Sequence, residues 1–66
     1  MPLSKAVELA QAKRQLRRIK EDKPAYSLRL QALGASPEAT RRLMEWFDNI
    51  QAEAQERVRQ LENELD

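Results

Sequence analysis

The chain has 66 residues, no cysteine and no histidine, and its twelve basic and eleven acidic residues leave a net charge of +1. These counts exclude disulfides, thiolate or imidazole metal sites, Cys or Ser-His nucleophiles and an imidazole pH switch. A chain of this length forms one domain, residues 1–66, in which apolar burial barely offsets the entropy lost on folding. We therefore expect self-association or a partner.

The first predicted element is a helix over residues 4–22. Ser4 can cap its start, because a serine hydroxyl accepts a hydrogen bond from an unpaired amide of the first turn. Apolar residues then recur at steps of 3, 4 and 3: Leu9, Ala12, Leu16 and Ile19. This spacing places them on one face, which we expect to pack against the later part of the chain.

Pro24 makes the next segment ambiguous. An interior proline removes a backbone hydrogen bond and also disfavours helical angles at Lys23, at a cost of ~3 kcal/mol. We therefore expect a break at residues 22–23 and a short second helix over 24–33. The alternative is a kinked continuous helix, because three apolar residues continue the first stripe in heptad register: Tyr26, Leu30 and Leu33. In either case Gly34 supplies the left-handed residue that ends the helix, and the chain folds back there.

The longest predicted element is a helix over residues 37–65. Ser36 fits its N-cap, and Pro37 fits the first helical position, where no amide hydrogen is needed. One nearly straight apolar stripe runs along it: Leu43, Phe47, Ile50, Ala54, Val58, Leu61 and Leu65. Near the start, Met44 and Trp46 widen the apolar arc to about 160° at ~100° per residue. Such an arc needs two neighbours, which we expect to be the second helix and the end of the first, with Trp46 as a core or interface anchor.

These elements predict an all-α helical hairpin that dimerises as a four-helix-type bundle. The argument for a dimer is that some apolar residues lie on the back of the N-terminal helices, where no other part of one hairpin can cover them. The predicted self-association residues are Leu3, Val7, Ala10, Leu28 and Ala32. The alternative is that small residues and a frayed terminus are simply exposed.

Charge is divided unevenly between the two halves of the chain. Residues 1–33 contain eight basic and three acidic residues, a net of +5, and residues 34–66 contain four and eight, a net of −4. Folding back is expected to place the N-terminal basic run beside two arginines near the turn, as a site for an anionic partner. The predicted patch consists of Lys13, Arg14, Arg17, Arg18, Lys20, Arg41 and Arg42. The alternative is a set of solvated faces and cross-helix ion pairs.

Residues 28–46 resemble the core of a helix-turn-helix, with a short helix, a glycine at the turn and a Ser-Pro-capped second helix. The fitting positions are Leu30, Gly34, Ser36 and Pro37. The resemblance covers 19 of 66 residues. It implies that Ser36, Glu38, Arg41 and Arg42 face DNA, while the basic residues between 13 and 20 contact phosphates.

No recognised catalytic or cofactor motif is present. Glu53 with Glu56, and Glu62 with Asp66, have helical spacing, but without histidine or a glycine-rich loop they favour solvated faces over a cation site. A single glycine leaves no phosphate loop or dinucleotide motif. We therefore predict no enzyme, no catalytic residue, no metal, no cofactor and no small-molecule substrate.

The predicted function is a small protein-protein interaction or regulatory module that self-associates and binds another protein. The alternative is a small helix-turn-helix-like DNA-binding regulator that uses the basic turn end. We prefer the first, because the half with a net charge of −4 would repel a polyanion. Apolar runs of only a few residues are far short of the ~20 that span a bilayer, and there is no signal-peptide core, so we expect a cytoplasmic protein.

Overall fold

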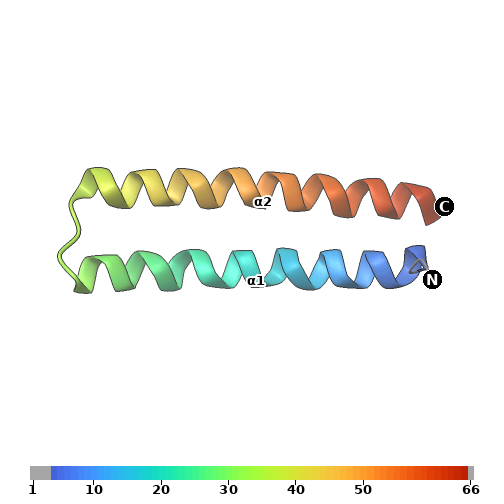
Figure 1. Ribbon diagram of the computed structural model, residues 1–66, viewed down its shortest axis with the longest axis horizontal. Coiled ribbons are helices and arrows are strands. Elements are labelled where there is room, and N and C mark those ends of the chain that lie inside the picture. Colours follow the sequence, from blue (N-terminus) through green and yellow to red (C-terminus); the bar gives the residue numbers. More distant parts are fainter. Residues whose placement is uncertain (1–3, 66) are drawn as a thin grey trace.

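Two helices of nearly equal length make up the fold (Figure 1). The computed structural model describes residues 4–65. Helix α1 spans Lys5–Ala32 and helix α2 spans Pro37–Leu65, and they lie antiparallel and side by side in a rod of 46 × 18 × 15 Å. The predicted all-α hairpin is confirmed, and α2 has its predicted bounds. Within residues 4–65, neither helix has the length and apolar character that crossing a membrane requires.

Both predicted N-caps are confirmed. The amide of Val7 donates a hydrogen bond to the Ser4 hydroxyl at 3.2 Å, and the amide of Ala39 donates one to the Ser36 hydroxyl at 3.1 Å. Each serine thus satisfies an amide that has no partner inside its helix. The two helices therefore begin where the sequence specifies.

Gly34 ends α1 in a left-handed conformation, with φ of +74°. The Ala35 amide donates to the Leu30 carbonyl at 3.0 Å, and the Gly34 amide donates to the Gln31 carbonyl at 3.1 Å. This pair of bonds is the Schellman motif, which satisfies the last carbonyls of a helix and turns the chain away from its axis. The turn predicted at Gly34 is confirmed.

The predicted break before Pro24 is wrong, because α1 continues through the proline to Ala32. The separate helix over 24–33 is the second half of α1. Pro24 and Lys20 are both exposed, so the Lys20 carbonyl that loses its amide partner can be hydrated. Apolar side chains before and after the proline pack on α2 and offset its cost. This packing stabilises the helix more than the low helix propensity of one residue destabilises it.

The core between the helices is thin. Its buried residues are Ala12, Phe47, Val58 and Leu61. In the half near the chain ends, the partly buried Leu9 and Leu16 pack against three of these residues: Ala12, Val58 and Leu61. Leu65, at the end of the stripe, is exposed. Burying a large apolar side chain stabilises by ~1.5–3 kcal/mol, so three such residues contribute roughly 5–9 kcal/mol, which is small beside the ~1–2 kcal/mol per residue that ordering the backbone costs. This agrees with the expectation of a marginally stable domain.

The wide apolar arc of α2 has one neighbour instead of two. We expected a second helix and the end of the first to share residues 43–50, but α1 is a single helix and covers only one side of them. As a result Trp46 is 54% exposed. The side left open forms the candidate site.

Candidate protein-protein interface

Three aromatic rings from both helices meet in the turn half of the hairpin. Phe47 is 4% exposed and lies between the other two: its ring centroid is 5.4 Å from that of Tyr26 and 5.1 Å from that of Trp46. The Trp46 ring meets Phe47 nearly edge to face, at 74°, a favoured aromatic geometry. Tyr26 is 41% exposed. Phe47 thus serves as the core beneath two aromatic residues that solvent reaches.

A hollow of about 240 Å³ opens over these rings on one side of the hairpin. We call it the aromatic groove, and it is lined by Ile19, Asp22, Tyr26, Leu43, Trp46, Phe47 and Ile50. A second hollow, of about 370 Å³, shares Ile19 and Ile50 with it and continues between the helices toward the chain ends. Its remaining lining is more polar: Gln15, Glu53, Ala54 and Arg57. The apolar part of this side is therefore confined to the turn half.

Two charged residues border the aromatic groove. Asp22 lines it, and the guanidinium carbon of Arg29 lies 5.4 Å from the centroid of the Tyr26 ring, within the range of a cation–π contact. Neither takes part in the ion pairs found within residues 4–65. The groove therefore has an unpaired acid and an unpaired base at its edge.

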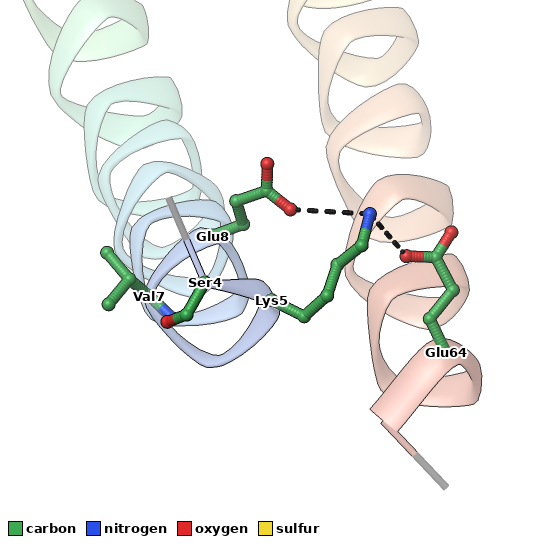
Figure 2. A network of polar contacts seen from close by, with 5 residues as sticks. All are labelled: Ser4, Lys5, Val7, Glu8 and Glu64. Carbon is green, nitrogen blue, oxygen red and sulfur yellow. Dashed lines mark hydrogen bonds and ion pairs between the residues drawn. The ribbon is translucent and has the colours of Figure 1, made fainter. Parts of the chain in front are cut away.

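Ion pairs tie the two helices together at the chain ends and in the middle. The Lys5 ammonium lies 2.9 Å from a Glu64 oxygen and 3.5 Å from a Glu8 oxygen (Figure 2). The hydrogen bond that Lys5 donates to Glu64, and then the negative charge of that carboxylate, raise the pKa of Lys5 above its ordinary value of 10.5. Farther along, Lys23 lies in the α1 stripe that faces α2 and pairs with Asp48. The one charged residue in this stripe therefore has a partner of opposite charge.

Other ion pairs lie within α2. Arg59 donates a hydrogen bond from Nε to Glu56 at 2.9 Å, which lowers the pKa of Glu56 below its ordinary 4.5 and raises that of Arg59. Arg41 and Arg42 pair with glutamates one turn away, at 4.0 and 3.5 Å. Exposed pairs of this kind contribute little to stability, because water and salt screen both charges. They do reduce the charge that Arg41 and Arg42 offer to an anionic partner.

The seven residues of the predicted basic patch are not brought together. The residue numbers in the pairs Lys5–Glu64 and Lys23–Asp48 add up to about 70, so Arg41 lies level with residue 29 of α1. That is roughly 13 Å from Lys20 and 24 Å from Lys13 along the axis at 1.5 Å per residue. The α1 members of the patch form a separate group: Lys13, Arg14, Arg17, Arg18 and Lys20. We call this group the basic segment, and it takes part in no ion pair among residues 4–65.

The helices do not have the arrangement that the helix-turn-helix resemblance implies. In that motif two helices cross at ~90–120°. Here α1 and α2 run antiparallel, and the helix before the turn is 28 residues long (Figure 1). The implied DNA-facing residues Ser36 and Glu38 instead serve as the α2 N-cap and as the ion-pair partner of Arg42.

The predicted self-association residues are exposed where the structure describes them. Leu28 is 68% exposed, and Val7, Ala10 and Ala32 are exposed as well, with Val7 on the side of α1 away from α2 (Figure 2). Leu3 lies outside the described residues. Their surface is interrupted, because the exposed middle of α1 between them carries the basic segment and Glu21.

The sequence pattern did not identify the aromatic groove, although Trp46 was predicted as an anchor. The sequence feature that indicates the groove is the wide apolar arc of α2, which needs two neighbouring helices and has one. Within residues 4–65, no group of three or more acidic side chains lies close enough to hold a metal ion. No family model, curated protein or solved structure matches the chain. Function must therefore be inferred from the surfaces of the molecule itself.

Proposed function

We propose that this chain is a small non-enzymatic protein-protein interaction or regulatory module that self-associates through its helices. The observation that supports this is the aromatic groove, where α2 has an apolar arc wide enough for two neighbours and contacts one. Exposed apolar surface of this kind marks an interaction site in a small protein. A helix from a second copy supplies the missing neighbour.

The size of the exposed apolar surface determines how tightly we expect two copies to associate. Tyr26 and Trp46 are each about half exposed, and a buried aromatic side chain covers 150–250 Å², so roughly 100 Å² of each remains to be buried. Covering both in two copies contributes about 10 kcal/mol at ~25 cal/mol per Å². Association costs ~4–15 kcal/mol and a micromolar dimer needs a net ~8 kcal/mol, so Tyr26 and Trp46 alone do not suffice, and we expect a micromolar dimer to bury other exposed apolar side chains such as Leu33 as well.

Sedimentation equilibrium across the micromolar range tests the proposal. Wild type should sediment as a dimer, and Trp46→Gln should shift it to the monomer while retaining helical circular dichroism. Leu28→Gln is the matched control. Leu28 is an exposed apolar residue on the back of α1 that the sequence pattern placed in the self-association surface, but it lies away from the aromatic groove, so its substitution should leave the dimer intact. If only Leu28→Gln dissociates the dimer, the interface is the back of α1. A wild type that is monomeric throughout would remove the proposal.

A small DNA-binding regulator is the second candidate. One observation favours it: the basic segment is exposed and has no ion pair among the residues that the structure describes. Such residues are available for phosphates. Its weakness is that Arg41 and Arg42 are paired and distant, which leaves no second element to read bases.

A further inference from the structure

One side of α1 carries five residues whose chemistry reads the same in both directions along the helix. They follow at steps of 3, 4, 3 and 4: Ile19, Asp22, Tyr26, Arg29 and Leu33. This spacing keeps them on one face of a continuous helix. From either end the order is apolar, charged, aromatic, charged and apolar, with the two charges opposite in sign.

This side is the α1 wall of the aromatic groove. Ile19, Asp22 and Tyr26 line the hollow, and Arg29 lies over the Tyr26 ring. Leu33, at the end of the series, is 76% exposed, so residues 4–65 leave most of it uncovered. The five residues share a face only because α1 continues through Pro24.

We infer that a second copy docks its α1 antiparallel along this wall, with the two Tyr26 side chains meeting at the two-fold axis. Ile19 and Leu33 are each seven residues from Tyr26. Ile19 of one copy therefore lies level with Leu33 of the other. Asp22 is four residues before Tyr26 and Arg29 is three after it, an offset of ~1.5 Å that an arginine side chain spans readily. This orientation rests on the proposed function and specifies its interface.

Charge selects the antiparallel orientation. In a parallel pair, Asp22 would face Asp22 and Arg29 would face Arg29, and like charges brought together oppose association. In the antiparallel pair, both unpaired charges at the groove gain an opposite partner, and they do so twice because the interface is two-fold symmetric. The helix of the second copy then covers the exposed faces of Tyr26 and Trp46 in each groove.

Disulfide cross-linking tests the orientation, because the chain has no cysteine of its own. Asp22→Cys and Arg29→Cys proteins are made separately, mixed in equal amounts and oxidised. We expect the mixed disulfide to exceed the statistical half of the cross-linked product. Dimers of each variant with itself, in excess of the mixed one, would show a parallel pair. Absence of cross-linking in a protein that still sediments as a dimer would place the interface on another surface.

A charge exchange supplies the second readout. Asp22→Arg or Arg29→Asp alone should weaken the dimer by roughly tenfold or more, and the double variant should restore the wild-type dissociation constant. Glu21→Arg is the matched control, since it makes the same charge change at an exposed neighbouring residue on another side of α1. Dimerisation of wild type without rescue by the double variant overturns the orientation alone. A monomeric wild type overturns the proposed function with it.

Discussion

Among single residues, Phe47 contributes most to the turn half of the hairpin. Its ring contacts both Tyr26 and Trp46 and is the only buried aromatic ring among the residues described. We expect Phe47→Ala to lower the free energy of unfolding by ~3–5 kcal/mol, from lost apolar burial and the cavity left behind. Because a domain of this size has little stability to lose, the variant should be largely unfolded.

Urea unfolding followed by circular dichroism measures this change. Leu28→Ala is the control, since truncating an exposed side chain on the back of α1 should change stability by no more than ~0.5 kcal/mol. Equal unfolding midpoints for the two variants would contradict the assigned core.

The ion pair between Lys5 and Glu64 predicts how the chain ends respond to pH. The raised pKa of Lys5 means that its contribution is complete below the ordinary value of 10.5 and is lost as the pH rises through the folded value. Glu56 has a lowered pKa, so its contribution is present above 4.5 and is lost as the pH falls through the folded value. With no histidine, we expect stability to be nearly flat between these limits.

NMR titration of the lysine side chains checks the first of these statements. Glu64→Gln should bring the pKa of Lys5 back toward 10.5 and increase amide exchange in the first turns of α1. Glu62→Gln is the comparison, because Glu62 takes no part in the ion pairs between Ser4 and Leu65. An unchanged Lys5 titration in Glu64→Gln would mean that the pair does not form in solution.

At the scale of the element, the continuity of α1 depends on packing that overrides Pro24. We expect Pro24→Ala to raise the free energy of unfolding, by up to ~3 kcal/mol, because alanine restores the hydrogen bond to the Lys20 carbonyl and removes the ring clash. Thermal unfolding should show a higher midpoint. A lower midpoint in Pro24→Ala would indicate that the proline ends one helix and starts another.

The pairing of α1 with α2 also accounts for Lys23, a charged residue in an otherwise apolar stripe of α1. Its side chain is partly buried, and its ammonium reaches Asp48 on α2. Because α1 and α2 are antiparallel, this contact also helps set their register. A charged residue at a helix-helix contact disfavours alternative registers, in which it would lose its partner.

For the molecule as a whole, the salt dependence of DNA binding distinguishes the two functional candidates. If the basic segment binds DNA, affinity should fall linearly in log salt, and Arg17→Ala with Arg18→Ala should lower the slope by ~0.9 for each contact removed. We expect instead that duplex binding is absent or nonspecific at physiological salt, since the other half of the chain carries −4. Fluorescence anisotropy with labelled duplexes measures this. Sub-micromolar, sequence-selective binding would reverse the order of the candidates.

Local signals in the sequence were sufficient to predict the N-caps of both helices and the position of the turn. Ser4 and Ser36 cap because of their own hydroxyls, and Gly34 turns because it has no side chain to oppose a positive φ. The stripe that predicted the core contains Phe47, Val58 and Leu61, which are buried. These features depend on residues within one or two turns of each other, so a linear pattern contains them.

Only the tertiary structure decided the course of α1 at Pro24 and the number of neighbours around α2. A proline sets a local cost, but whether the helix continues depends on how much the flanking side chains gain by packing on another helix. Once α1 is continuous, residues 13–20 lie far from Arg41, and residues 43–50 have one neighbour. The open side with Tyr26 and Trp46 follows from that pairing, because a sequence specifies how wide an apolar face is but not how many helices cover it.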